Sequence, residues 1–196
     1  MTPSNATRYE KKVMSKEDVV KLLGTLDLRE RLIVRLAIFA GLRPGEIFAL
    51  KWGHVKSGSV SIEQRICDGK IDTPKTYRSR RTAALTPMIV AEFGAFGTVS
   101  PSVAPDAWVF PSERMKTPLC KANWWHRDME PKLKPLGLAW ATFQVMRRTH
   151  ASLSRRAGID PKVVADQLGH KPRGQFGGLY KVGFRAADGG REKARI

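Results

Sequence analysis

The pattern that decides the fold of this chain is TFQVMRRTHAS at residues 142–152, followed by LGH at residues 168–170 and by Tyr180. Gln144, Arg147 and Arg148 are spaced i, i+3 and i+4, so a helix would place them on one face. A guanidinium beside buried helix surface needs an anion, and a phosphate matches its parallel N–H donors. A solvated or ion-paired side chain is the alternative for Arg147 taken alone. Together with a tyrosine hydroxyl, these groups suit an attack on a phosphodiester whose charge the arginines hold.

The composition of the chain is strongly basic. Its 196 residues include 35 lysines and arginines against 18 aspartates and glutamates, a formal net charge of +17. Such a surplus favours a polyanionic partner, nucleic acid first and an anionic membrane second. A protein with a merely basic surface is the alternative. The longest apolar run, residues 32–42, is interrupted by Arg35 and is too short to span a bilayer. We therefore expect nucleic acid, and no membrane, as the partner.

The two cysteines bear on the cellular compartment. Cys67 and Cys120 lie far apart in the sequence and show no metal-ligand spacing. Buried thiols in a reducing, intracellular protein are the simpler interpretation. The first residues contain no apolar run of the kind that a secretory signal needs. The sequence thus predicts a cytoplasmic protein that binds no metal through its cysteines.

Periodicity predicts a mainly helical chain. We expect helices over residues 15–24, 28–41, 87–97, 120–132, 143–157 and 161–168, a short one from Pro44, and a weaker one over 175–182. The helix over 28–41 is apolar around most of its circumference and should be central. Between residues 52 and 85, the β-branched residues and the Asp68-Gly69 turn predict two or three antiparallel strands. The expected fold class is α+β: mainly α with one small antiparallel β-sheet.

The length suits a single domain with tails. We expect residues 1–13 to be a leader or linker, residues 14–182 to form the domain, and residues 183–196 to be a flexible tail.

A series of motifs stands in order along the chain. They are Gly-Leu-Arg-x-x-Glu at 41–46, Lys75 in a strand connection, Thr-x-x-x-x-Arg at 142–147, Leu-Gly-His at 168–170, and Tyr180. This order resembles the catalytic domain of the tyrosine recombinases, the phage-integrase family, over about residues 14–182. The resemblance implies the fold of the DNA breaking-rejoining enzymes and a bacterial, phage or mobile-element origin. It also implies an N-terminal DNA-gripping domain that this chain lacks.

The resemblance implies a catalytic role for residues in each motif. Arg43 and Arg147 would clamp the scissile phosphate and neutralise charge that develops on its oxygens. Lys75 would protonate the 5′-oxygen leaving group, and His170 would donate a hydrogen bond to the phosphate. Tyr180 would be the nucleophile and form a 3′-phosphotyrosyl bond. Such a site needs neither a metal nor a cofactor.

Other residues have supporting roles in this interpretation. Glu46 would support Arg43 through its helix turn, or would only interact favourably with the helix N-terminus. Further cations would contact the DNA backbone or be solvated: Arg78, Arg80, Arg81, Arg148 and Lys171. Lys75 has the same alternative, and Tyr180 could be an ordinary amphipathic anchor. His150 suits a core histidine with a satisfied hydrogen bond.

Gln144 departs from the family pattern, which usually has histidine at this position. Glutamine can donate a hydrogen bond to phosphate but cannot exchange a proton at pH 7. We interpret position 144 as part of a tuned site that retains activity.

Site-specific recombination, for integration or excision, is the function that the motifs favour. A full-length recombinase would act as a tetramer on paired DNA sites, whereas an isolated catalytic domain could be a monomer. A type IB topoisomerase-like enzyme that relaxes DNA is one alternative. A non-catalytic DNA-binding regulator with the same fold is the other.

Overall fold

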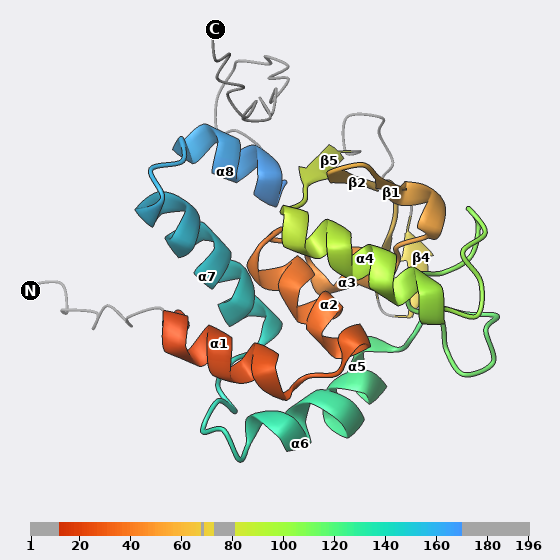
Figure 1. Ribbon diagram of the computed structural model, residues 1–196, viewed down its shortest axis with the longest axis horizontal. Helices are drawn as coiled ribbons and strands as arrows, with labels where there is room; N and C mark the ends of the chain where they lie inside the picture. Colours follow the sequence, from red (N-terminus) through yellow and green to blue (C-terminus); the bar gives the residue numbers. More distant parts are fainter. Residues whose placement is uncertain (1–11, 68, 73–80, 170–196) are drawn as a thin grey trace, which may run out of the picture.

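Helix α2 (Leu28–Ile38) lies at the centre of the fold (Figure 1). The computed structural model describes residues 12–67, 69–72 and 81–169. The apolar side chains around α2 are fully buried: Leu32, Ile33, Val34, Leu36, Ala37 and Ile38. Helices α7 (Phe143–Arg156) and α4 (Pro87–Val99) both pack against it. A helix that is apolar on most sides needs such neighbours, so its expected central position is confirmed. It ends at Ile38, earlier than we expected.

Helix α1 (Lys16–Thr25) begins with the expected capping box. The Ser15 backbone N–H donates to Asp18 Oδ2 at 3.0 Å, and the Asp18 N–H donates to Ser15 Oγ at 3.0 Å. Both donors would otherwise lack partners at the helix start. Gly24 was expected to end this helix, but it lies inside the last turn.

The strands form two small sheets, so the expectation of one sheet was wrong. A three-stranded antiparallel sheet has the order β1-β2-β5, and a separate hairpin joins β3 to β4. Their bounds are Val55–Lys56 for β1, Ser59–Ile62 for β2, Arg65–Cys67 for β3, Lys70–Asp72 for β4 and Arg81–Ala84 for β5. Strand β2 has β1 on one side and β5 on the other. Strand β3 pairs with β4, and Arg65 bonds Asp72 across that hairpin at 2.7 Å.

The helical segment expected over residues 120–132 is interrupted. It consists of α5 (Lys121–Trp124), a π-helical turn (Trp125–Met129) and α6 (Glu130–Leu133). Pro131 has no backbone N–H to continue the α-helical ladder, which explains the wider turn before it. Trp124 is buried against Phe48, with ring centroids 5.5 Å apart, and Trp125 is half-buried.

Three helices frame the region that the motifs single out. Short α3 (Pro44–Ile47) follows α2, and Pro44 occupies its first turn as expected. Helix α7 is capped by Thr142, and α8 (Pro161–Leu168) is capped by Asp160. The expected extents of α7 and α8 are confirmed within a residue at each end.

Buried carboxylates elsewhere in the fold have cationic partners. Glu30 on α2 lies 2.5 Å from Lys132 Nζ, and Glu92 on α4 lies 2.7 Å from Arg35 Nη1. A buried charge is costly unless it is paired in this way. These ion pairs tie α6 and α4 to the central helix.

The cysteines differ from expectation. Cys67 is in the edge hairpin and Cys120 precedes α5, and both thiols are exposed. The prediction of buried thiols was wrong because both residues lie on peripheral elements. In the described ranges, no helix combines the length and the apolar character needed to cross a membrane.

Candidate active site

The turn after α2 places Arg43 at the start of α3. Gly41 has a φ of +64°, and a Cβ atom there would lie 2.7 Å from the His150 ring and 2.8 Å from the Leu168 side chain. Only glycine fits this turn, because of both its left-handed backbone and the close packing. His150 is buried, and its Nδ1 lies 3.1 Å from the Ile38 carbonyl oxygen, as expected for a core histidine.

The Glu46 carboxylate joins Arg43 to Arg81. Its side chain is 4% exposed, and it accepts the Arg43 backbone N–H at 2.8 Å and Arg43 Nη1 at 3.0 Å. Arg81 Nη1 and Nη2 donate to the two carboxylate oxygens at 2.7 and 2.8 Å. Glu46 thus lies against Arg43, as we expected, and also forms a bidentate ion pair with the sheet.

Arg81, which we expected to contact the DNA backbone or to be solvated, is instead ion-paired inside the protein in the absence of DNA. Its side chain is 15% exposed and its guanidinium is directed at Glu46 from strand β5. Arg81 Nε also donates to the Gln167 carbonyl at 3.2 Å. All three nitrogen atoms of the Arg81 guanidinium therefore donate hydrogen bonds within the protein.

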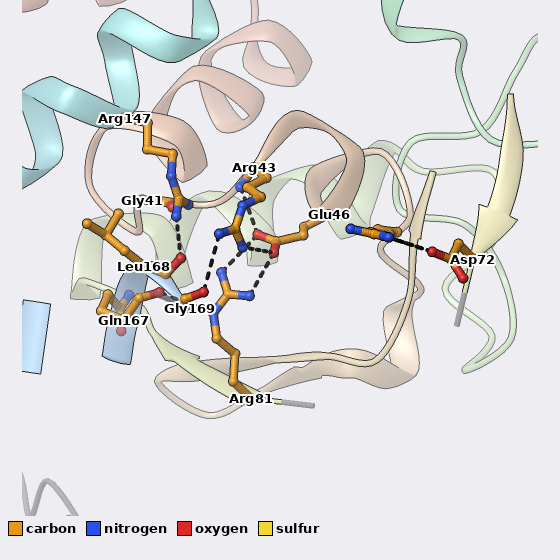
Figure 2. Close-up of polar contacts among 10 residues, drawn as sticks. Gly41, Arg43, Glu46, Asp72, Arg81, Arg147, Gln167, Leu168 and Gly169 are labelled. Carbon is orange, nitrogen blue, oxygen red and sulfur yellow. Dashed lines mark hydrogen bonds and ion pairs between the residues drawn. The ribbon is translucent and has the colours of Figure 1, made fainter. Parts of the chain in front are cut away.

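Three arginines, Arg43, Arg81 and Arg147, form a cluster at the C-terminal end of α8 (Figure 2). Arg81 donates to the Gln167 carbonyl, Arg147 Nη2 to the Leu168 carbonyl, and Arg43 Nη2 to the Gly169 carbonyl at 3.2 Å. Arg147 Nη1 also donates to the Gly41 carbonyl. The last carbonyls of a helix lack intrahelical partners and lie at the negative end of its dipole. They can thus orient guanidinium groups without cancelling their charge.

The left-handed backbone at Gly169 makes this helix end possible. Gly169 has a φ of +62°, and a Cβ atom there would lie 2.9 Å from the Arg81 guanidinium. A side chain at this position would displace Arg81 from the helix end.

The electrostatics of the cluster leave positive charge without a counterion among the described residues. Burial and then the positive charge of Arg43 lower the pKa of Arg147 from its ordinary range to about 10, so this side chain stays charged at neutral pH. Burial raises the pKa of Glu46, but the hydrogen bond and charge of Arg81, followed by those of Arg43, outweigh it. The net pKa of Glu46 lies below its ordinary value of 4.5. One carboxylate thus faces three guanidinium groups, and an added anion would be attracted.

Gln144 lies on the first turn of α7, exposed to solvent. It lines a surface hollow of about 470 Å³ together with Pro44, Trp125 and Phe143. Pro44 directly follows Arg43 in sequence, so this hollow lies beside the start of α3, but Arg43, Arg81 and Arg147 do not line it. Arg148 is half-buried on the same helix.

Several expected site residues lie outside the described ranges. They are Lys75, Arg78, Arg80, His170, Lys171 and Tyr180, and the expected helix over 175–182 and tail over 183–196 lie outside as well. In sequence, His170 directly follows Gly169, and Lys75 falls between β4 and β5.

Sequence reasoning missed Gln167 and the carbonyls at the end of α8. Backbone carbonyls carry no residue signature, so only the position of the helix end reveals them. The glycine after a helical pattern is the available signal, because it marks a left-handed helix stop.

The fold is that of the catalytic domain of a tyrosine recombinase, as comparison with solved structures shows. The Tn1549 transposon integrase, in complex with circular intermediate DNA, matches with a TM-score of 0.71 at 15% identity, over 85% of this chain and 61% of that one. XerA recombinase matches with a TM-score of 0.70 at 20% identity, over 87% and 59%. A lambda integrase tetramer bound to a Holliday junction matches with a TM-score of 0.58 at 15% identity, over 90% and 52%. The chain therefore spans about three fifths of the first two proteins and about half of the third.

Residues 12–176 match the Phage integrase family, and the chain belongs to that family. The family and fold that the sequence motifs suggested are thus confirmed. A comparison with curated proteins gave no significant match.

The position of Glu46 generates a pH prediction. Its lowered pKa means that the ionised carboxylate stabilises the folded state above about pH 4.5, and that this contribution is lost as the pH falls through the folded-state pKa. We expect Glu46→Gln to lower the free energy of unfolding at pH 7 by about 3 kcal/mol. The difference from wild type should shrink as the pH falls below 4.5. Chemical denaturation across pH 3–7 measures both.

The matched control for this prediction is Glu113→Gln, a substitution of an exposed glutamate. It should leave the free energy of unfolding nearly unchanged at every pH. A Glu46→Gln deficit that stays constant down to pH 3 would contradict the assignment of an ionised, ion-paired Glu46.

Proposed function

We propose that this chain is the catalytic domain of a site-specific recombinase that cleaves and rejoins DNA strands through a 3′-phosphotyrosyl intermediate. The observation that carries the proposal, with double-stranded DNA as the partner, is the arginine cluster, in which carbonyls orient Arg147 and one Nη group of Arg43, and three guanidinium groups face the one carboxylate of Glu46. A phosphodiester is the anion that two guanidinium forks at such a site would bind. The integrase and recombinase structures with the same fold, several of them DNA complexes, support DNA as the substrate.

The reaction has two balanced steps. Tyr180 loses its hydroxyl proton to solvent, attacks the scissile phosphorus, forms the tyrosine–phosphate bond and displaces the 5′-oxygen of the next nucleotide, which takes a proton from Lys75. In the second step a 5′-hydroxyl attacks the phosphotyrosine and restores the phosphodiester and the tyrosine. In this return step Lys75 recovers a proton from the attacking 5′-hydroxyl, and the released tyrosine takes one from solvent. The bond energy is conserved in the covalent intermediate, so rejoining needs no external energy source.

The arginines have the largest role in this mechanism. Negative charge increases on the non-bridging oxygens when the tyrosine attacks, and preoriented cations stabilise that charge. A tyrosine has an ordinary pKa of about 10, and neighbouring guanidinium groups favour its phenolate form. His170 would donate a further hydrogen bond to the same phosphate.

Gln144 would occupy the position at which other members of the family usually have a histidine that donates a hydrogen bond to the phosphate. Its amide can donate a hydrogen bond to a phosphate oxygen but cannot supply a proton. Leaving-group protonation would then depend on Lys75. The exposed position of Gln144, in the hollow beside the start of α3, supports access to DNA.

The proposed recombination also implies a DNA partner and an assembly of several subunits. Recombination joins two DNA sites, and the lambda integrase in the comparison is a tetramer on a Holliday junction. We propose that the full-length protein assembles as a tetramer on paired sites, within a cytoplasmic, DNA-associated setting. The strongly basic charge of +17 suits binding to the phosphate backbone.

The nucleophile is tested with a nicked duplex that traps the cleaved strand. The wild-type chain should form a covalent protein–DNA adduct on a denaturing gel, and Tyr180→Phe should abolish it because the hydroxyl is lost. Tyr77→Phe, the same substitution at another tyrosine, is the control and should retain the adduct. DNA binding without any adduct would indicate a non-catalytic regulator. Plasmid relaxation without recombinant products would indicate a topoisomerase.

Arg147→Ala tests the phosphate clamp. Because its interaction strengthens as charge develops, we expect cleavage of bound DNA to fall by about 10²–10³-fold. Binding of the same duplex should fall far less. The control is Arg156→Ala, at an exposed arginine in the last turn of the same helix, which should leave cleavage of bound DNA unchanged. A parallel loss of binding and cleavage in Arg147→Ala would contradict the transition-state role.

Gln144→His tests whether the site needs proton exchange at this position. We expect cleavage to change by less than about threefold, since hydrogen bonding suffices, and Gln144→Ala to lower it by about tenfold or more. Single-turnover cleavage rates of the two variants give the comparison. A large gain in the histidine variant would show that the native site is impaired.

A further inference from the structure

Gln167, the penultimate residue of α8, uses its side-chain amide to join three parts of the fold. Its Nε2 donates to the Ala40 carbonyl at 2.9 Å and to the Ala84 carbonyl at 3.0 Å. Its Oε1 accepts the Ala84 backbone N–H at 3.0 Å. Both amide hydrogens and the amide oxygen thus have partners, on the turn after α2 and on strand β5.

The pairing with Ala84 extends the sheet. An antiparallel strand presents the N–H and the carbonyl of one residue to the same side. Ala84 is opposite Ser59 of β2, and its N–H and carbonyl both bind the Gln167 amide. The glutamine amide therefore occupies the place of a neighbouring peptide group and fixes α8 to the edge of β5. Arg81, on the same strand, adds its bond to the Gln167 carbonyl.

Gln167 and its bonding partner Ala40 are each adjacent in sequence to a residue whose carbonyl accepts a hydrogen bond from Arg147. Arg147 Nη1 donates to the Gly41 carbonyl, and Gly41 directly follows Ala40. Arg147 Nη2 donates to the carbonyl of Leu168, the residue after Gln167 (Figure 2). The bond from Gln167 to Ala40 therefore sets the separation between the two carbonyls that Arg147 joins. In addition, the Gly41 turn packs directly on the Leu168 side chain.

We propose that Gln167 is a positioning residue for the phosphate clamp: its amide holds the Ala40–Gly41 turn and the end of α8 at the separation that aims Arg147, and through Gly169 also Arg43, at the scissile phosphate. The inference rests on the proposed function for its catalytic consequence, but the positioning of Arg147 is a property of the protein alone. Small displacements of a preoriented cation are costly in the transition state, whereas ground-state binding depends mainly on charge.

The test compares Gln167→Met with Gln64→Met. Methionine keeps the length of the side chain and removes its amide hydrogen bonds. Gln64 is the matched control because its amide also donates to a backbone carbonyl, that of Ala49 at 2.7 Å, and because it is also half-buried. Both substitutions should lower the melting temperature of the 196-residue chain, Gln167→Met by more because it removes three hydrogen bonds and Gln64→Met removes one.

Cleavage and binding separate a positioning role from a structural one. In Gln167→Met, single-turnover cleavage of the nicked duplex should fall by about tenfold or more, while binding of the duplex changes less than about twofold. Gln64→Met should cleave at the wild-type rate when compared at a temperature where both proteins are folded. Equal cleavage by the two variants would overturn the proposal.

Arginine side-chain NMR provides a measurement that does not depend on catalysis. With both Nη groups held by fixed carbonyls, the Arg147 guanidinium of the wild type should rotate slowly about its Nε–Cζ bond. In Gln167→Met that rotation should become fast, and in Gln64→Met it should stay slow. Unchanged rotation in Gln167→Met would refute the positioning of Arg147. If the wild-type chain forms no adduct while the rotation changes as expected, the proposed function fails and the positioning role stands.

Discussion

The buried carboxylate of Glu46 is the interaction on which the arrangement of the site depends. Among the residues that the structure describes, it is the one acidic group beside Arg43, Arg81 and Arg147, and it connects α3 with strand β5. Removing one partner of a buried ion pair typically costs about 3–5 kcal/mol, because the other charge is left uncompensated. Glu46 therefore has to stay ionised for α3 and the sheet to keep their relative position. The same contact fixes the backbone at Arg43 through its N–H.

The contrast between carboxylate and carbonyl acceptors explains how the site combines order with charge. Elsewhere in the fold, Lys132 and Arg35 meet carboxylates, which both orient and neutralise them. Arg147 instead donates to the carbonyls of Gly41 and Leu168. Carbonyl dipoles orient a guanidinium but leave its net charge available. This is what a phosphate clamp requires, and burial beside Arg43 accordingly lowers the pKa of Arg147 to about 10.

Much of the fold followed from sequence because local signals were strong. The capping box at Ser15, the apolar circumference of α2 and Pro44 at the start of α3 are signals of this kind. The split of the strands into two sheets could not be predicted, because strand pairing depends on which edges are already occupied. Similarly, Pro131 was visible in the sequence, but the π-helical turn that it produces depends on the packing of Trp124 and Met129 in the core.

The motifs singled out Arg43 and Arg147, and the structure brings both guanidinium groups to the end of α8, while their roles toward a phosphate stay a prediction. The site was not predictable where the chemistry depends on backbone groups or on contacts between distant segments. Arg81 is a basic residue of the type that contacts DNA phosphates. Its partner Glu46, however, lies 35 residues away in sequence. Gln167 carries no motif at all, and its role depends on Ala40 and Ala84 being brought beside α8.

The central claim is that the arginine cluster carries more positive charge than Glu46 balances, so that Arg147, and Arg43 although it shares Glu46, can bind a phosphate, whereas both Nη groups of Arg81 are committed to Glu46. A titration of the protein, labelled with ¹⁵N in its arginine side chains, with inorganic phosphate tests it most directly. The account predicts that the guanidinium signals of Arg43 and Arg147 shift together and saturate, while those of Arg81 stay nearly constant. A shift of Arg81 as large as theirs, or no shift of Arg147, would contradict it.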